Sequence, residues 1–335
     1  MDCTTLYTWI ENSSYEWTDE TYIQWGECYG DTLSPLRQVW LDSEYAYAVT
    51  SSGLNIFDIE SNNKVAYVYV EDGYTTIWGS DTAIYLGTES EGIKYIIKST
   101  ILTDVDSPID LTAFVNTYDF YYNASSVNIK YLHGYLDTLA VTTPVGIDII
   151  NNGPNGYKSS ASNNHITKCF LTDNREVYYI EQKEDYDKVL VVYSCLFDWS
   201  THDASYITDG TTLASGVRIN DIFITTNTSI SGNNNSIFIA TSSGAYVIDE
   251  ESTLFDIYLT TLAGQSTDIR GIWADNTTNR IRGKMYTTSF GIGAALSVMD
   301  MSTGSLYDRY TIVDRGRANK TLVTEAVVDI VAGGN

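Results

Sequence analysis

The sequence predicts an all-β fold built from repeated four-stranded units, and three observations support this prediction. The stretch at residues 46–61, AYAVTSSGLNIFDIES, returns at residues 237–252 as IFIATSSGAYVIDEES, with the turn and the following Asp at one offset. Similar units recur about every 40 to 55 residues, a spacing typical of repeated β-sheets. The chain has 27 Tyr, 24 Gly and only 4 Pro, and it shows no long apolar pattern with the 3.6-residue period of a helix.

Each copy of the repeated stretch has the features of a β-hairpin. Two apolar, β-branched runs flank a short polar turn that ends on glycine, Gly53 in one copy and Gly244 in the other. Glycine adopts the positive φ that tight turns require and that other residues resist. The equivalent turn positions in the other units are Gly92, Gly146, Lys188 and Gly293.

Six complete units are predicted between residues 36 and 313. Each has an incoming strand, a hairpin of two strands and an outgoing strand. In the second unit, PIDLTAFV at 108–115 is the expected outgoing strand. The predicted units span residues 38–70, 75–115, 129–162, 166–208, 219–260 and 269–311.

The two ends of the chain are predicted to form one further unit together. Residues 4–27 follow the same pattern from its second strand onward, as TTLYTWI, a turn at ENSS, YEWTDE and TYIQWGE. The missing incoming strand is expected from LVTEAVVDIV at 322–331, so that residues 1–30 and 320–331 make a composite unit. A ring closed by both ends leaves no unpaired sheet edge to recruit other chains.

These units resemble the blades of β-propeller proteins, in the looser style of regulator-type and WD-like propellers. The resemblance covers nearly the whole chain as a pattern. It implies a single domain over residues 1–335, with about seven four-stranded blades packed radially. The chain departs from the named subfamilies, because it lacks repeated Gly-His…Trp-Asp pairs, Tyr-Trp-Thr-Asp repeats and Ser-x-Asp-x-Gly-x-Thr-Trp boxes, and Glu16-Trp17-Thr18-Asp19 occurs only once.

The charge of the chain excludes several classes of partner. Acidic residues outnumber basic ones 43 to 19, which gives a formal net charge of −24. A field of this sign repels phosphates and anionic lipids, so we expect no nucleic-acid partner. No apolar run approaches the roughly 20 residues that span a bilayer, so we expect no membrane insertion.

Few residues of this sequence are typical of catalysis. The three histidines, His133, His165 and His202, have no metal-ligand spacing, and neither a Gly-x-Ser-x-Gly motif nor a phosphate-binding Gly loop is present. We therefore expect no enzyme activity and no cofactor. His133 ends an incoming strand, where a structural hydrogen bond is favoured over a functional role.

Two acidic loops are candidate calcium sites, because calcium binds several oxygen ligands. Asp104, Asp106 and Asp110 share one connection, and Asp275 begins the run Asp-Asn-Thr-Thr-Asn. Neither matches the twelve-residue calcium loop, and solvated turns are favoured, so no metal is expected.

The four cysteines are expected to be free thiols. In the predicted units, Cys3 and Cys28 lie on non-adjacent strands, as do Cys169 and Cys195. Such strands are about 9–10 Å apart, and a disulfide needs Cα atoms within about 7 Å.

The best interaction candidate is an aromatic connection between two units. Residues 116–127, NTYDFYYNASSV, hold four aromatic side chains, and alternating connections place them on one face with a hairpin tip and a later loop. Tyrosine combines a broad apolar surface with a polar tip, which suits protein interfaces and sugar rings. The alternative is that these rings fill gaps between blades. The candidate binding residues are Tyr118, Phe120, Tyr121, Tyr122, Asp185, Tyr186 and Phe290.

These features favour a non-enzymatic structural or attachment component of a virus particle. The surface composition, rich in Tyr, Thr, Ser and Asn and poor in Lys, resembles that of a phage virion protein, while the N-terminal residues lack a signal-peptide pattern. We therefore expect a virion location, as in the tail of a phage, with other virion proteins as partners and a host-surface glycan as a further ligand. The alternative is a secreted or cell-surface propeller for adhesion or glycan binding.

Overall fold

The structure is a computed structural model. It describes residues 5–11, 17–24, 36–61, 63–71, 73–101, 107–118, 128–136, 138–144, 146–151, 157–161, 165–172, 176–182, 187–192, 205–208, 216–225, 236–249, 256–257, 269–275, 282–287, 295–300 and 305–311. Within these ranges the regular structure is β-strand, apart from two three-residue 3₁₀ turns, η1 (Lys98–Thr100) and η2 (Thr112–Phe114). The all-β prediction is thus confirmed for this part of the chain.

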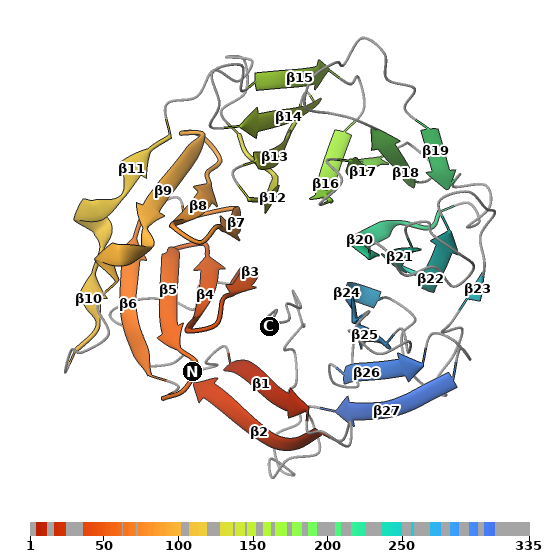
Figure 1. Ribbon diagram of the computed structural model, residues 1–335, viewed down its shortest axis with the longest axis horizontal. Helices are drawn as coiled ribbons and strands as arrows, with labels where there is room; N and C mark the ends of the chain where they lie inside the picture. The colour runs from red at the N-terminus through yellow and green to blue at the C-terminus, as the bar shows by residue number, and fades with distance from the viewer. Residues whose placement is uncertain are drawn as a thin grey trace.

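The described strands form seven sheets that are arranged radially around one axis (Figure 1). We call the sheet nearest the N-terminus the terminal sheet and number the others in chain order. The terminal sheet contains β1 (Thr5–Glu11) and β2 (Trp17–Gln24). The first sheet contains β3 (Leu36–Leu41), β4 (Tyr45–Thr50), β5 (Gly53–Asp58), β6 (Lys64–Tyr69) and β10 (Ile109–Asp110). The second contains β7 (Thr76–Gly79), β8 (Ala83–Gly87), β9 (Ile93–Ile97) and β11 (Asn116–Thr117).

The remaining four sheets each follow the chain from the axis outward. The third contains β12 (Tyr131–Tyr135), β13 (Thr138–Thr143), β14 (Gly146–Asn151) and β15 (Tyr157–Ala161). The fourth contains β16 (His165–Leu171), β17 (Val177–Gln182), β18 (Asp187–Val192) and β19 (Ser205–Thr208). The fifth contains β20 (Ile219–Thr225), β21 (Ser236–Thr241), β22 (Gly244–Asp249) and β23 (Asp256–Ile257). The sixth contains β24 (Ile269–Asp275), β25 (Arg282–Thr287), β26 (Ala295–Asp300) and β27 (Ser305–Thr311).

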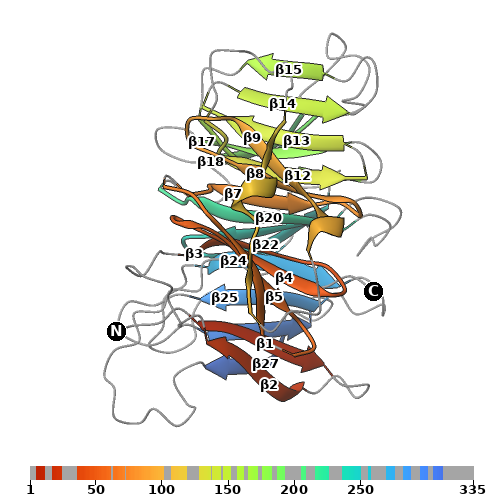
Figure 2. The same ribbon diagram turned by 90° about the vertical axis from the view of Figure 1, so that its left-hand side faces the viewer.

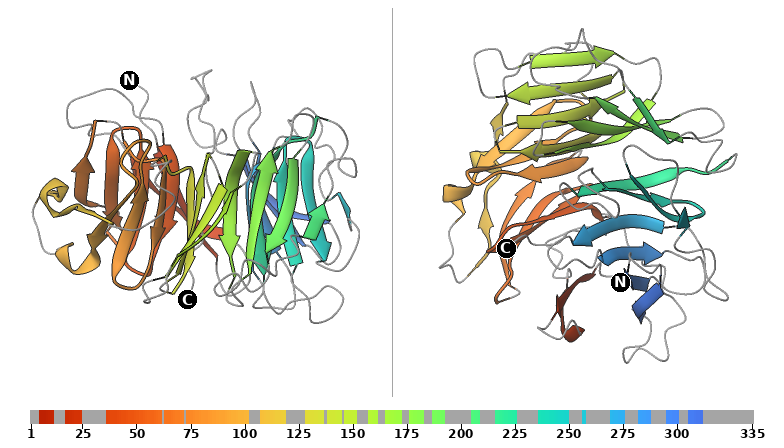
Figure 3. Two further views of the ribbon diagram at one scale, coloured as in Figure 1. Left: turned by 90° about the horizontal axis from the view of Figure 1, so that it is seen from above. Right: turned by 45° about the vertical axis from the view of Figure 1, so that its right-hand side comes forward.

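The strand nearest the axis in each of the six numbered sheets is called its inner strand (β3, β7, β12, β16, β20 and β24). Inner strands of consecutive sheets are neighbours from β3 to β24. Edge-on views show the strands standing along the axis (Figure 2 and the left panel of Figure 3). The predicted closing strand at 320–331 lies outside the described residues. Ring closure and the count of about seven blades therefore remain predictions.

The repeated stretch forms the central hairpin of its sheet, as predicted. Thr50 pairs with Gly53 across the first turn, and Thr241 pairs with Gly244 across the second. The Thr50 Oγ1 accepts the Ser52 N–H at 3.2 Å and donates to the Gly53 carbonyl at 3.2 Å, which holds the turn closed. Gly53 has a φ of +138°, and a Cβ there would lie 1.9 Å from the Val68 carbonyl oxygen, so only glycine fits.

The prediction for residues 108–115 was wrong. Ile109 and Asp110 pair in parallel with β6 of the first sheet, and β11 forms the outer strand of the second sheet. The alternating apolar residues of this run point into the cluster between these two sheets, where Leu111 is fully buried. The alternating apolar pattern therefore belongs to a segment that fills the space between two sheet edges. It does not form a full strand.

The prediction of two separate strands within 15–27 was also wrong. One strand, β2, runs from Trp17 to Gln24 and pairs with β1 through its length, with Thr21 opposite Thr8. No Gly, Pro or Asn lies near the Glu20–Thr21 peptide bond, where a turn was expected, so the backbone stays extended.

The hydrophobic core is divided among the spaces between neighbouring sheets. The largest cluster packs Tyr47, Leu54 and Ile56 of the first sheet against Ile77 and Leu86 of the second. Similar clusters join the second sheet to the third, the third to the fourth and the fourth to the fifth. Burying one such side chain contributes about 1.5–3 kcal/mol, so apolar packing holds these four pairs of sheets together.

No helix in the described part of the chain has the length and hydrophobicity that a membrane crossing needs.

Candidate interaction site

Of the predicted binding residues, Tyr118 alone belongs to the described part of the chain. It is the last described residue of the segment Ser107–Tyr118. We call the predicted aromatic connection at residues 116–127 the aromatic loop. The other candidates lie outside the described residues, so the structure does not place them: Phe120, Tyr121, Tyr122, Asp185, Tyr186 and Phe290.

Tyr118 is half-buried and packs on the second sheet. Its ring meets Tyr85 edge-on at 5.5 Å between centroids, and Tyr95 at 5.9 Å. Its backbone N–H donates to the Ile93 carbonyl at 2.9 Å, which continues the pairing of β11 with β9. Tyr118 thus fills a gap on the sheet and anchors the start of the aromatic loop.

The segment Ser107–Tyr118 forms a strap over the outer edges of the first two sheets. β10 pairs with β6, η2 follows, and β11 pairs with β9. The Tyr69 N–H donates to the Thr112 Oγ1 at 3.2 Å, which ties the middle of the strap to the first sheet. Covering an edge in this way removes backbone groups that would otherwise pair with another chain.

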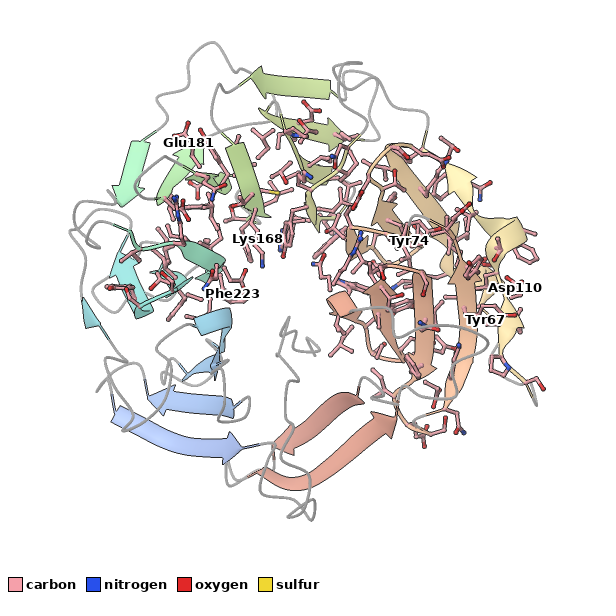
Figure 4. All side chains as sticks on the ribbon, turned by 180° about the vertical axis from the view of Figure 1, so that it is seen from behind. Tyr67, Tyr74, Asp110, Lys168, Glu181 and Phe223 are labelled. Atoms are coloured by element: carbon pink, nitrogen blue, oxygen red, sulfur yellow. The ribbon has the colours of Figure 1, made fainter. Side chains whose placement is uncertain are left out.

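The strap gives the outer rim an apolar character. Phe114 of the strap, Tyr69 at the end of β6 and Ile97 at the end of β9 are large apolar residues that stay exposed, with 49%, 63% and 44% of their surface accessible. Figure 4 shows Tyr67 and Asp110 at this outer edge, well away from the axis. The rim and the base of the aromatic loop therefore adjoin.

The calcium candidate Asp110 has a structural role in the strap. Its Oδ1 accepts hydrogen bonds from the Thr112 Oγ1 at 2.6 Å and from the Thr112 N–H at 2.9 Å. These bonds hold the pKa of Asp110 below its usual value. Asp104 and Asp106 lie outside the described residues, and no group of three potential metal ligands occurs within the described ones.

The inner strands carry a row of aromatic rings that the sequence interpretation missed. One aromatic residue from each of five consecutive inner strands contacts the ring of the next. The centroid distances are 6.1 Å from Trp40 to Trp78, 4.7 Å from Trp78 to His133, 4.1 Å from His133 to Phe170 and 5.3 Å from Phe170 to Phe223. We call this row the aromatic belt. Figure 4 places its member Phe223 beside the axis.

Glycines make room for the belt on the neighbouring strand. A Cβ on Gly79 would lie 2.3 Å from the Trp40 ring, and one on Gly134 would lie 2.3 Å from the Trp78 Nε1. Each tryptophan therefore lies directly on the backbone of the next inner strand. This contact brings the sheets close near the axis.

Polar side chains two residues before the belt positions join consecutive sheets. The Gln38 Oε1 accepts the Thr76 hydroxyl at 2.6 Å and the Ile77 N–H at 3.0 Å. The Thr76 Oγ1 in turn accepts the Leu132 N–H of the third sheet at 3.0 Å. Residues i and i+2 of a strand share a face, which explains why this polar row runs beside the aromatic belt.

The third and fourth sheets are joined through His133 itself. Its Nδ1 accepts the Leu171 N–H at 3.1 Å, while its ring lies between Trp78 and Phe170. Because Nδ1 is an acceptor, the neutral ring carries its proton on Nε2. Burial lowers the pKa of His133 to about 3, so the ring is neutral near pH 7. The structural role expected for His133 is confirmed for these contacts.

Carboxylates join the fourth, fifth and sixth sheets. The Asp187 Oδ1 accepts from Arg218 and its Oδ2 from the Ile219 N–H, both at 2.8 Å. The Asp221 Oδ1 accepts from Lys168 at 3.0 Å, and its Oδ2 accepts the Ile272 N–H of the sixth sheet at 3.2 Å. Both carboxylates are buried, so these charge-assisted bonds lie where water competes least. Lys168 lies beside the axis (Figure 4).

A further ion pair joins the first two sheets. Lys98 lies 2.7 Å from the Asp42 carboxylate and 4.5 Å from the centroid of the Trp40 ring. Burial alone would raise the pKa of Asp42, but hydrogen bonds from Lys98, Glu44 N–H and Tyr45 N–H lower it by more. The same carboxylate accepts the Tyr47 hydroxyl, whose pKa rises mainly through burial.

Cys169 is the one cysteine in the described part of the chain, and it is a free, buried thiol as predicted. Its Sγ donates to the Ala140 carbonyl at 3.4 Å, and burial raises its pKa. Cys3, Cys28 and Cys195 lie outside the described residues.

The belt has a signal in the sequence that alignment of the incoming strands reveals. The segments QVWLD, TIWGS, YLHGY, KCFLT, DIFIT and GIWAD each place an apolar residue second and a ring third. The ring positions are Trp40, Trp78, His133, Phe170, Phe223 and Trp273. No comparable signal identifies the rim residues, because their exposure depends on the strap.

No protein-family model and no curated protein matches this sequence. Among solved structures, the chain is similar to the Neurospora crassa Pan2 WD40 domain, with 10% identity, a TM-score of 0.53 and coverage of 80% of this chain and 76% of that one. It is similar to the extracellular domain of the two-component system protein BT4673 from B. thetaiotaomicron, with 15% identity and a TM-score of 0.54, over 80% of this chain and 33% of that one. It also resembles the computationally designed Ika8 protein, with 13% identity and a TM-score of 0.50, over 83% and 75%.

At these identities the similarity shows the fold alone, which is β-propeller-like.

Proposed function

We propose that this protein is a rigid, non-enzymatic β-propeller that binds other proteins through its loops, as a structural or attachment component of a tailed phage particle. The observation that carries the proposal is the set of joints between consecutive sheets, four made by side chains of inner strands and one by Asp187 of β18. In each joint a buried or half-buried side chain of one sheet accepts a backbone N–H of the next.

These joints support a scaffold role for the inner strands. A net hydrogen bond contributes about 0.5–1.5 kcal/mol, and one to a charged group about 1.5–3 kcal/mol. Five such links, together with the aromatic belt, make relative movement of the sheets costly. Within the described residues, Gln38, Thr76, His133 and Asp221 of the inner strands each bond to the next sheet, which supports a structural role for these polar groups.

Recognition then falls to the connections, where a rigid scaffold usually presents binding residues. The aromatic loop starts at Tyr118, which is fixed on the second sheet by Tyr85 and Tyr95. A specific interface needs about 800 Å² on each partner. We therefore propose that several connections bind together, and that they include Phe120, Tyr121, Tyr122, Asp185, Tyr186 and Phe290.

The particle context rests on composition and charge. A net charge of −24 disfavours nucleic acid and anionic lipid as partners, and the surface is rich in small hydroxyl and amide residues. Other virion proteins are the proposed partners, with a host-surface glycan as a further ligand.

Imaging of native particles, combined with mass spectrometry of their proteins, tests this proposal. We expect the protein at a fixed stoichiometry, in ring-shaped density that contacts its neighbours through one face. Recovery of the protein only from cell surfaces or medium, together with binding on a glycan array, would instead support the adhesion propeller. If the protein neither associates with particles nor binds glycans, both proposals are wrong.

A further inference from the structure

The five joints between consecutive sheets differ in one chemical respect. The first two, made by Gln38 and Thr76, use acceptors that do not titrate. The next three use the imidazole of His133 and the carboxylates of Asp187 and Asp221. Ionisable acceptors thus occur in the last three of these five joints.

The His133 joint differs again from the two carboxylate joints. An imidazole that is released into water has a pKa of about 6.5, whereas a released Asp has a pKa of about 3.9. Below about pH 6.5, opening of the His133 joint is therefore coupled to proton uptake by the released imidazole.

We propose that the joint between the third and fourth sheets is a proton-sensitive hinge, which mild acid opens while the Gln38 and Thr76 joints stay closed. The geometry carries this proposal. Protonation of the His133 Nδ1 would place an N–H against the Leu171 N–H, which lies 3.1 Å away, and the hydrogen bond between the two sheets would be lost. The charged ring would also lie between Trp78 and Phe170, which limit its access to water.

The groups around His133 do not compensate for a positive charge. From β7 it meets the uncharged Trp78. From β16 it meets Phe170 and lies near Cys169, and the charged residue of that strand face is Lys168, which is itself positive and paired with Asp221. On its own strand the residue of the same face is Tyr131, over which Lys168 lies at 5.1 Å. Acid therefore favours the open joint, where water can solvate the ring.

The direction of the pH effect follows from linkage. The folded pKa of His133 lies below its unfolded value, so the stability of the closed joint is complete above about pH 6.5 and declines as the pH falls below it. Uptake of one proton changes the opening equilibrium by up to about tenfold per pH unit. Between about pH 6.5 and about pH 5 the predicted change is up to about 30-fold.

Amide hydrogen exchange followed by mass spectrometry tests the hinge on the whole protein, at about pH 7.5 and about pH 5, after correction for the intrinsic pH dependence of exchange. The peptide with the Leu171 amide should lose protection by up to about 30-fold. Peptides with the Ile77 and Leu132 amides, which bond to Gln38 and Thr76, should keep theirs.

His133→Asn is the matched variant, because its Oδ1 can accept the Leu171 N–H without titrating. It should abolish the pH response at Leu171, while His202→Asn, which removes a different histidine, should retain it. Equal loss at all three amides, no loss at Leu171, or a response that persists in His133→Asn would each overturn the hinge. If His133→Asn folds poorly, the comparison of the Leu171, Ile77 and Leu132 amides in the wild-type protein still tests the hinge.

Discussion

At the scale of single residues, two glycines decide how closely neighbouring sheets approach the axis. Gly79 and Gly134 leave the space that the Trp40 and Trp78 rings occupy, since an added Cβ would lie 2.3 Å from either ring. Glycine is usually costly in a strand because it packs nothing. Here the lost packing is replaced by a tryptophan of the preceding sheet.

Gly134→Ala should therefore destabilise the fold through overpacking. The expected loss is about 1–3 kcal/mol in the free energy of unfolding, because the methyl group must displace the indole of Trp78. Denaturant unfolding measures it. Combining Gly134→Ala with Trp78→Phe should recover part of the loss, and a Gly134→Ala variant as stable as the wild type would contradict the close contact.

At the scale of elements, the joints show how one strand specifies its neighbour. The bulges in β3 and β20, between Leu36 and Gln38 and between Ile219 and Asp221, lie directly before the joining side chains. A bulge changes the direction of a side chain. The change of direction at these bulges explains how Gln38 and Asp221 both reach the adjacent sheet.

Asp221→Ala should weaken the contacts of the fifth sheet on both sides. It removes the carboxylate that pairs with Lys168 and the acceptor of the Ile272 N–H. The expected cost is about 3–5 kcal/mol, as for breaking other buried ion pairs. Asp221→Asn is the control, because an amide oxygen can still accept the Ile272 N–H and should recover part of the stability in thermal or denaturant unfolding.

At the scale of the whole molecule, we predict that the C-terminal residues close the ring by supplying the missing incoming strand of the terminal sheet. We predict that Leu322–Val331 forms hydrogen bonds with the strand around Leu6–Ile10. Removal of residues 320–335 should then lower stability and promote association, because it would expose a strand edge. An experimental structure in which the N-terminal strands leave the ring to bind another subunit would contradict this closure and reduce the count to six blades.

The aromatic loop supplies the prediction for binding. Replacing Phe120, Tyr121 and Tyr122 with Ser should leave thermal stability unchanged and weaken incorporation into particles, measured by quantitative mass spectrometry. Tyr118→Ser is the contrasting variant, because Tyr118 packs on Tyr85 and Tyr95, and its loss should lower stability first. A triple variant that melts early and still incorporates would show that the three rings pack the blades.

The sequence by itself determined the all-β character and the hairpins of the repeated units. These features follow from local chemistry: alternating apolar residues, and a Thr-x-x-Gly turn in which Thr50 bonds across to Gly53. It also placed His133 on an incoming strand, although His133 lies in the middle of β12 (Tyr131–Tyr135) and not at its end. The aromatic belt was present as a column in aligned strands, although the pattern alone does not show that consecutive rings touch.

Only the tertiary structure decided which strand meets which sheet edge. Ile109 and Asp110 look like part of an outgoing strand, but the burial of Leu111 between two sheets places them on β6 instead. The joints are equally non-local, since Gln38 meets Ile77 and Asp221 meets Ile272 across separate sheets. Such pairings depend on the distance between inner strands, and packing between whole sheets sets that distance.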